Sequence, residues 1–284
     1  MLAAALTLLG LTAAAELWLR CAAVHRDAVV AAIVGAHEGR GSGVILGHSH
    51  TFALGARLKG YDNLSIPGAN IPTMRALAAI RIRGAPLRHA IVAAGPELLS
   101  VASLARGDSG LGDILALGPL YLLQAPLARR LVPSLLRPTA GAEAEMRALG
   151  VGDRWNEVAP ERRAIWTGAR VDQQRPGTGA ERDAHLQIYA AMLADLRAAG
   201  VQICLVRTPV TPAYLQAIAT DPAFVAAEQA LRGLAVQAGA HWIDFREMQP
   251  PLALSAFLNQ DHVNAVGAAR FAPWLRRRCE DSAR

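Results

Sequence analysis

A serine and a histidine that lie far apart in this 284-residue chain have the surroundings of a nucleophilic relay. Ser49 follows the apolar run at 44–46 and a glycine, and His262 comes directly after Asp261 and three residues after Asn259. In such a relay the histidine takes the proton of the serine hydroxyl as its oxygen attacks a carbonyl carbon, and a carboxylate or an amide orients the ring. The two segments therefore predict attack on an ester or another acyl group, with formation of an acyl-serine.

The elements that would hold these side chains alternate along the chain. Short apolar runs predict strands at 44–46, about 63–66, 89–94, 201–206 and 241–245. Helical patterns cover 71–82, 180–199, 221–239 and 264–278. This alternation predicts an α/β domain with a central parallel sheet of about five strands and helices on both faces. Ser49 lies just after the first strand and before a helical pattern at 51–58, where such sheets bind ligands and where a helix dipole favours negative charge.

Three segments of the chain resemble the motif blocks of the SGNH (GDSL-type) hydrolase superfamily. The family's Gly-Asp-Ser block reads Gly47-His48-Ser49 here, and its second block, which offers a glycine amide, reads Asn63-Leu-Ser-Ile-Pro-Gly68-Ala-Asn70. The last block, Asp-x-x-His followed by Asn and Gly-Ala, reads Asn259-Gln-Asp-His262-Val-Asn-Ala-Val-Gly267-Ala. The order of these parts is most similar to the membrane-anchored bacterial branch, which includes O-acetylation proteins of cell-surface polysaccharides and D-alanyl transfer proteins of teichoic acids.

The resemblance implies a three-layer α/β/α sandwich with a flavodoxin-like strand arrangement. It also implies a serine esterase or O-acyltransferase that needs no cofactor, with Ser49 as nucleophile, His262 as base, and the amides of Ser49 and Gly68 as oxyanion hole. The substrate would be a small-molecule or polysaccharide acyl ester, and a membrane acyltransferase could be a partner. The residues expected to bind the substrate are His48, Asn70 and Arg207. Arg207 ends the fourth strand, at the ligand-binding edge, but it could equally form a structural salt bridge.

The chain departs from the family pattern at positions that normally support the serine. His48 stands where the family has an acidic residue, and Glu97 stands where an asparagine donates to the oxyanion. Loss of one such donor typically lowers the rate about 10²–10³-fold. Asn259 occupies the position of the triad acid, so either Asn259 by its position or Asp261 by its charge could orient His262. These departures favour an alternative function, a catalytically weak or inactive protein that binds glycan or a partner in a membrane assembly.

Other chemistries have weaker support in the sequence. Ser49, taken alone, could simply cap the helix that follows it. His48 and His50 could bind a metal, but no third ligand is evident beside them, so no metal site is predicted. The single glycine before His-Ser-His is not the glycine-rich loop of a nucleotide-binding domain.

The composition indicates a large apolar core, because 52% of the residues are hydrophobic and 18% are charged. The net charge of +6 comes mostly from scattered arginines, which predicts contact with an anionic membrane or glycan and no nucleic-acid binding. Residues 1–20 are almost wholly apolar and predict a membrane anchor or a signal segment, with the orientation left open. The SGNH-like domain would span 40–284 on the extracytoplasmic side, with inserts at about 108–138 and 153–182, the second of which is polar, rich in glycine and proline, and predicted to be a long loop. Three irregularly spaced cysteines predict no disulfide framework, and Cys204 would be an ordinary core residue.

Overall fold

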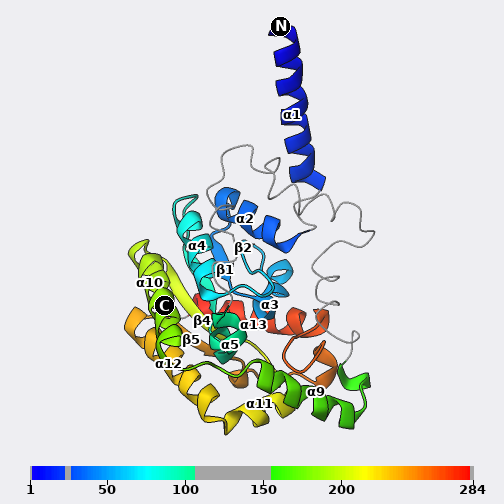
Figure 1. Cartoon of the computed structure of the whole chain (residues 1–284), viewed down its shortest axis with the longest axis vertical. Coiled ribbons are helices and arrows are strands. Elements are labelled where there is room, and N and C mark those ends of the chain that lie inside the picture. Colours follow the sequence, from blue (N-terminus) through cyan, green and yellow to red (C-terminus); the bar gives the residue numbers. More distant parts are fainter. Residues whose placement is uncertain (1, 23–26, 106–154, 282–284) are drawn as a thin grey trace.

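A five-stranded parallel sheet forms the centre of the described structure (Figure 1). The computed structural model describes residues 2–22, 27–105 and 155–281. The strands lie in the order β2-β1-β3-β4-β5, and each neighbouring pair is parallel. They are β1 (Gly43–Leu46), β2 (Tyr61–Asn63), β3 (His89–Ala93), β4 (Gln202–Arg207) and β5 (His241–Asp244). The predicted α/β class and sheet are therefore confirmed, and the strand order is that of flavodoxin-like sheets.

The second strand begins earlier than its apolar residues suggest. The apolar pattern predicts a strand near 63–66, whereas β2 covers Tyr61–Asn63. The two apolar residues still follow the edge of the sheet, because Leu64 N–H donates to Ile45 O at 2.9 Å and Ile66 N–H donates to Gly47 O at 3.1 Å. This extension carries the chain past the end of β1 and toward Gly68.

The helices are α1 (Leu2–Ala22), α2 (Ala28–Glu38), α3 (Ser49–Phe52), α4 (Ile71–Ile82), α5 (Val101–Leu104), α9 (Pro160–Gln173), α10 (Gly179–Ala198), α11 (Pro212–Ala219), α12 (Pro222–Ala238) and α13 (Ala265–Asp281). The short 3₁₀ turns are η2 (Gly55–Arg57), η3 (Pro96–Leu99), η5 (Trp155–Glu157), η6 (Phe245–Glu247) and η7 (Leu254–Ala256). The four long helices expected from the sequence correspond to α4, α10, α12 and α13. Local signals mark their ends: Asn70 accepts from Thr73 N–H at the start of α4, and Gly239 ends α12 with a φ of 61°.

Side chains from alternate strand positions enter two separate apolar clusters, as the two-residue period of a strand requires. Val44 and Leu46 pack in one cluster with residues of α2, α4, α10 and α12. Ile45 packs in the other cluster, with residues of α13 such as Phe271 and Leu275. Both clusters are buried, which explains why the strands read as continuous apolar runs.

The prediction that the cysteines form no disulfide is wrong for one pair. Cys204 of β4 is bonded to Cys279 of α13, with their Cα atoms 5.8 Å apart and a separation of 75 positions in the sequence. The sequence could not show this, because the pairing depends on α13 returning to cover the face of the sheet on which Cys204 lies. The bond ties the last helix to a central strand.

Removal of this disulfide is expected to lower the free energy of unfolding by about 2–4 kcal/mol, because the cross-link restricts the unfolded chain. Urea denaturation of the oxidised protein and of the Cys204→Ala, Cys279→Ala double variant would measure the difference. Dithiothreitol should lower the stability of the wild type but leave the double variant unchanged. A double variant as stable as the wild type would contradict this prediction.

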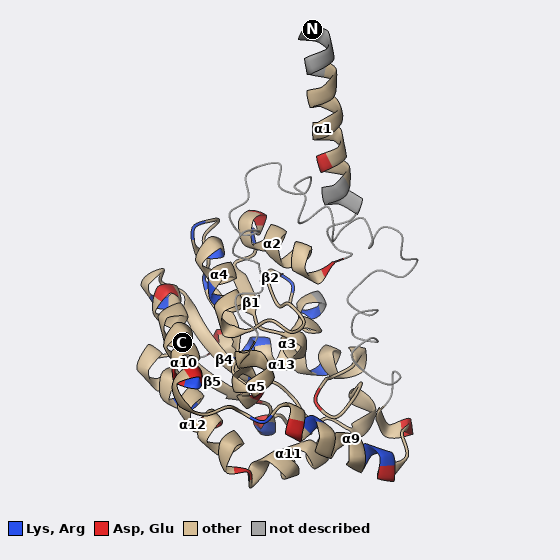
Figure 2. Cartoon of the chain, viewed as in Figure 1, with Lys and Arg blue, Asp and Glu red and all other residues tan. Residues whose placement is uncertain are grey.

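Charged residues lie on the outer helices and loops (Figure 2), and several of them form ion pairs. At the carboxyl ends of β4 and β5, Arg232 and Arg246 contact Glu228 and Asp244. At the end of α9, Arg175 contacts Asp172 at 3.1 Å. Part of the positive charge of this chain is therefore neutralised locally, and contact with an anionic membrane or glycan stays a prediction.

The N-terminal segment and the first predicted insert are only partly covered by the described residues. Residues 2–22 form α1, and Leu8, Leu9 and Leu11 on it are each more than 60% exposed. None of the helices in the described part of the chain has both the length and the apolar character needed to cross a membrane. The insert predicted at 108–138 lies outside the described residues. The segment at 153–182, expected to be a polar loop, contains α9 instead.

Candidate active site

The predicted nucleophile lies at the carboxyl edge of the sheet, where the direction of the strand order changes. Ser49 follows β1, and Glu97 lies in η3, which follows the neighbouring strand β3. His262 lies in the segment that joins β5 to α13. Open parallel sheets bind ligands beside such a switch point, because the connections from adjacent strands leave in opposite directions and open a crevice.

The structure brings Ser49 and His262 into direct contact. His262 Nε2 lies 2.8 Å from Ser49 Oγ, and the two residues are 1% and 9% exposed. Ser49 is not the helix cap that a lone serine would suggest, because His48 occupies the N-cap position and its side chain accepts from His50 N–H. The helical pattern at 51–58 is broken into α3 and η2, so the dipole expected beside Ser49 comes from a single turn.

Both candidate partners of the histidine lie against its other ring nitrogen. His262 Nδ1 is 2.9 Å from Asp261 Oδ1 and 3.0 Å from Asn259 Oδ1. Asn259 Oδ1 also accepts the backbone N–H groups of Asp261 and His262, at 3.1 and 2.8 Å. This closes a tight loop, in which Leu258 N–H donates to His262 O at 2.9 Å. The loop explains how adjacent side chains, which rarely meet, both reach the same site.

Asp261 is fully buried and collects several donors on its second oxygen. Asp261 Oδ2 accepts from Arg170 Nε and Gln174 Nε2, each at 2.8 Å, and lies 3.1 Å from His50 Nε2. Burial raises the pKa of Asp261, but the adjacent His262 and the hydrogen bonds of both histidines outweigh it and lower the pKa well below its usual value. The carboxylate therefore stays ionised at neutral pH, and the guanidinium of Arg170 compensates its charge.

No family model and no curated protein matches this chain. The likeness to SGNH hydrolases therefore depends on the three motif blocks and on the arrangement of their residues in space. Ser49, His262, Asp261 and Asn259 meet in one buried group, as expected from the order of the blocks.

The other predicted residues divide into those near Ser49 and those elsewhere. Gly68 and His48 line the same cavity as Ser49, which has a volume of about 260 Å³. Gly68 has a φ of 76°, a conformation that glycine adopts without strain. Asn70 accepts from Thr73 at the start of α4 and is absent from the cavity wall, so the structure gives it a capping role.

Arg207 also lies apart from the nucleophile. Its buried guanidinium contacts Glu228, and the residue lines a different cavity, beside α11 and α12. The structure therefore places Arg207 in the salt bridge that the sequence allowed as its alternative role. Burial lowers its pKa, while the charge of Glu228 raises it, and the net direction is downward.

Glu97 and His50 complete the wall of the cavity beside Ser49. The ring of His50 stacks on that of His262, with 4.3 Å between centroids. Burial and the neighbouring His262 lower the pKa of His50 to about 4. Burial raises the pKa of Glu97, but His50 and His48 outweigh it and lower the pKa to about 2. At neutral pH the site therefore holds a neutral His50 and an ionised Glu97.

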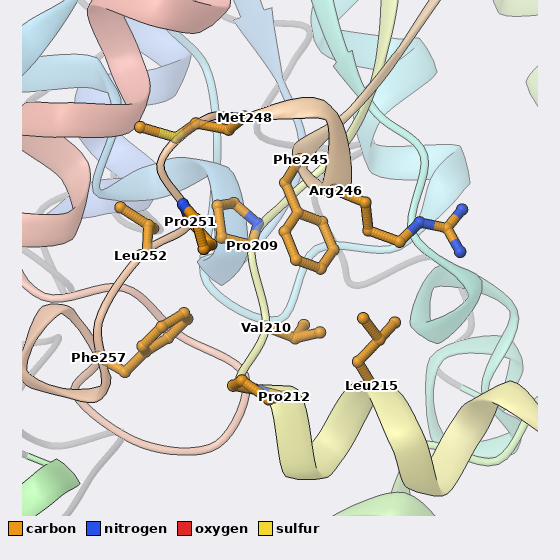
Figure 3. A pocket seen from close by; sticks show the side chains of 10 residues that line it. All are labelled: Pro209, Val210, Pro212, Leu215, Phe245, Arg246, Met248, Pro251, Leu252 and Phe257. Atoms are coloured by element: carbon orange, nitrogen blue, oxygen red, sulfur yellow. The ribbon is translucent and has the colours of Figure 1, made fainter.

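A second cavity, of about 220 Å³, lies beside the loop that carries His262 (Figure 3). Apart from Arg246, its wall consists of apolar side chains from η6, α11 and the connecting loops, and the figure shows Phe257 and Leu215 on opposite sides of it. None of the residues of the serine relay lines this cavity, and Phe257 lies two residues before Asn259. The cavity therefore adjoins the relay loop without containing the reacting groups.

Arg170 and Gln174 are the site residues that the sequence analysis missed. Both come from the segment expected to be a loop, where glycine and proline obscure a helix that begins at Pro160 with Glu161 in its first turn. The buried positions Thr167, Val171 and Gln174 recur at helical spacing and could have shown this helix. Nothing in the sequence indicates that its end docks on Asp261.

Proposed function

We propose that this protein is a serine esterase or O-acyltransferase that acts on an acyl ester through a covalent acyl-Ser49. One observation carries the proposal: a continuous hydrogen-bonded series joins the hydroxyl of Ser49, both ring nitrogens of His262 and the ionised carboxylate of Asp261. These are the parts of a nucleophilic triad, and each contact lies within the 2.6–3.2 Å range that proton transfer requires.

The reaction follows from these contacts. Ser49 Oγ attacks the ester carbonyl carbon while His262 Nε2 takes the hydroxyl proton, and Asp261 stabilises the imidazolium that forms. The tetrahedral intermediate collapses, the bond to the leaving oxygen breaks, and His262 returns the proton to that oxygen. The acyl-serine then transfers its acyl group to water or to a sugar hydroxyl: the proton of this acceptor passes to His262, the bond from the acyl carbon to Ser49 Oγ breaks, and His262 returns the proton to Ser49 Oγ. Hydrolysis and transfer use the same residues and differ only in the acceptor.

We assign the role of triad acid to Asp261, one of the two candidates that the sequence leaves open. Both oxygens that face His262 Nδ1 lie at nearly equal distance, but only the carboxylate carries a charge that opposes that of the imidazolium. Asn259 instead organises the loop through two backbone amides. We assign the oxyanion hole to the amides of Ser49 and Gly68, since ionised Glu97 cannot donate a hydrogen bond.

Several features support a carbohydrate-linked ester outside the cytoplasm as substrate. The Cys204–Cys279 disulfide is typical of proteins in oxidising compartments. The apolar residues 1–20 favour a membrane anchor or signal segment, and the motif blocks resemble a branch that modifies cell-surface polysaccharides. The proposal also includes a membrane acyltransferase as partner and a three-layer sandwich as the fold. The two apolar clusters, which receive side chains from alternate strand positions, favour the three-layer sandwich.

Labelling by a serine-directed fluorophosphonate tests the proposal, because the reagent forms a stable bond only with an activated serine. Wild type should be labelled at Ser49, as located by peptide mass spectrometry, while Ser49→Ala and His262→Ala should lose the label. Ser103→Ala is the matched control, since Ser103 lines the same cavity without contacting the relay, and it should be labelled like the wild type. Absence of label on the folded wild type would instead favour the catalytically inactive, glycan- or partner-binding alternative, to which Glu97 in place of an oxyanion donor points.

A further inference from the structure

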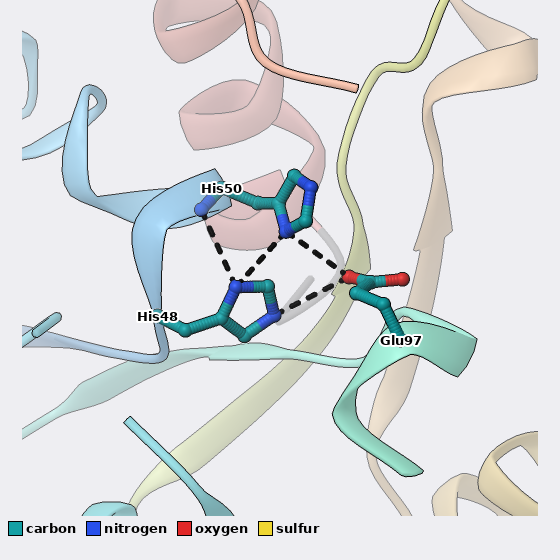
Figure 4. A group of neighbouring side chains, drawn as sticks. All are labelled: His48, His50 and Glu97. Atoms are coloured by element: carbon teal, nitrogen blue, oxygen red, sulfur yellow. Dashed lines mark hydrogen bonds and ion pairs between the residues drawn. The ribbon is translucent and has the colours of Figure 1, made fainter. Parts of the chain in front are cut away.

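Three side chains beside the serine form a cluster that the triad does not use (Figure 4). His48 and His50 come from the start of α3, and Glu97 comes from η3 on the adjacent strand connection. One ligand atom from each lies within 4.8 Å of the others. His48 and His50 are 6% and 5% exposed, and all three residues line the 260 Å³ cavity. The third ligand that the sequence lacked is therefore supplied by the fold.

The surroundings of the two histidines determine where their protons lie. His48 Nε2 is 3.3 Å from Glu97 Oε1, and His50 Nε2 is 3.1 Å from Asp261 Oδ2. A carboxylate accepts and cannot donate when ionised, so a proton on Nε2 of each histidine suits these two contacts. His48 Nδ1 also accepts from His50 N–H, at 3.4 Å, which again requires a lone pair on that nitrogen.

The two unprotonated Nδ1 atoms consequently face each other. They lie 2.9 Å apart, and Figure 4 shows the two nitrogens directed toward each other. Their lone pairs repel unless a proton or a metal cation lies between them. The space between these two nitrogens, beside Ser49, can therefore accommodate one positive charge.

The charge of Glu97 points to the same conclusion. Asp261 has the guanidinium of Arg170 at 2.8 Å, whereas the cationic or titratable groups within 4 Å of Glu97, among the described residues, are the two histidines alone. A buried carboxylate is stable only with a compensating positive charge or strong donors. His48 Nε2 meets Glu97 without making a well-aligned hydrogen bond. One further cation would balance this part of the site.

We propose that His48, His50 and Glu97 bind one divalent transition-metal ion, best matched by Zn²⁺, with its remaining position open to the cavity beside Ser49. Two imidazoles and one glutamate with an open position are a set that zinc uses in catalytic sites. Imidazole and carboxylate together also select zinc over magnesium or calcium, which prefer oxygen ligands alone.

Two of the three spacings between ligand atoms are already close to those that the ion requires. Bonds of about 2.0–2.1 Å in a tetrahedral arrangement place neighbouring ligand atoms about 3.3–3.4 Å apart. His50 Nδ1 and Glu97 Oε1 are already 3.4 Å apart, and the two Nδ1 atoms must separate by a few tenths of an ångström. His50 Nε2–H would keep Asp261 as its carboxylate partner, as metal-bound histidines usually do, whereas Glu97 would leave His48 Nε2 to bind the ion.

The consequence for catalysis rests on the proposed function, whereas binding of the ion does not. A cation in this position would attract the carbonyl oxygen of an ester and stabilise the negative charge that develops on it. It would thereby take over the role of the missing oxyanion donor at Glu97. The ion would also explain why both His48 and Glu97 differ from the residues of the family pattern, because both would bind it.

Metal binding can be measured on the full chain without any substrate. After treatment with a chelator and removal of the chelator, titration with Zn²⁺ against a chromophoric indicator should show one tight site per chain. Glu97→Gln and His48→Ala should each weaken this site at least 100-fold, because each removes a ligand. His185→Ala is the matched control, since His185 lies partly buried on α10 and outside the three-residue cluster, and it should bind like the wild type.

Two outcomes would overturn the proposal: a wild type that binds no Zn²⁺ at micromolar concentration, or cluster variants that bind as tightly as the wild type. Circular dichroism shows whether the variants are folded. If they are not, the visible spectrum of the Co²⁺-loaded wild type decides, because a four-coordinate nitrogen and oxygen site absorbs strongly and a loosely bound ion does not. Fluorophosphonate labelling is scored separately, so loss of activity and loss of metal binding cannot be confused.

Discussion

Replacement of Asp261 with asparagine is expected to lower kcat for ester cleavage about 10⁴-fold, the typical effect of an amide in place of a triad acid. Asparagine keeps the shape of the side chain but offers no charge to stabilise the imidazolium of His262. Its amide group can also donate to Nδ1, which would move the proton to Nε2 and leave no base for Ser49. Hydrolysis of a p-nitrophenyl ester at saturating concentration measures kcat directly.

The matched variant for this experiment is Asn259→Ala. It removes the second oxygen beside His262 Nδ1 and frees two backbone amides of the loop. The loss of kcat should be clearly smaller, while stability should fall by about 1–3 kcal/mol because buried donors lose their acceptor. A fall in kcat for folded Asn259→Ala that equals the fall for Asp261→Asn would make Asn259 the orienting residue and contradict our assignment.

A large decrease in the free energy of unfolding is expected for Asp62→Ala, in strand β2. Asp62 Oδ2 accepts from Arg81 Nε at 2.9 Å and from Gly41 N–H at 3.0 Å. The Arg81 side chain is fully buried, and its other donors bind the carbonyl oxygens of Gly41 and Ala85. Removal of one partner of a buried ion pair leaves the other charge without compensation, so the free energy of unfolding should fall by about 3–5 kcal/mol.

Urea denaturation followed by circular dichroism would measure this loss. Asp183→Ala is the control, because Asp183 pairs with Arg182 on the surface of α10, and its side chain is 56% exposed. An exposed pair of this kind contributes at most about 1 kcal/mol. Equal losses for the two variants would show that burial of Arg81 does not decide the energy of its ion pair.

Much of the fold could be predicted because local signals agree with the apolar pattern. The helix at 71–82 begins after a capping asparagine, with a proline in its first turn, and the structure places α4 at the same bounds. Strand β2 was predicted late, because Leu64 and Ile66 are as apolar as a strand but follow the sheet only as an edge extension. The helix α9 was missed, since its flanking glycines and prolines resemble those of a loop.

The site divides in a similar way. The order of the motif blocks indicated Ser49 and His262, and their residue types indicated the roles of nucleophile and base. The choice between Asn259 and Asp261 depends on a loop that directs both side chains toward one nitrogen, and no periodic pattern encodes it. The contacts of Arg170 and of Cys279 join segments far apart in the chain, so they depend on packing that only the folded molecule defines.

The link between β4 and α13 also affects what a cut in the backbone would do. The segment that carries His262 leaves β5 and enters α13, and α13 is covalently joined to the strand beside β5. A protease that cleaved the loop between β5 and Asn259 would therefore release no fragment. The histidine would stay covalently attached to the part of the chain that contains the serine.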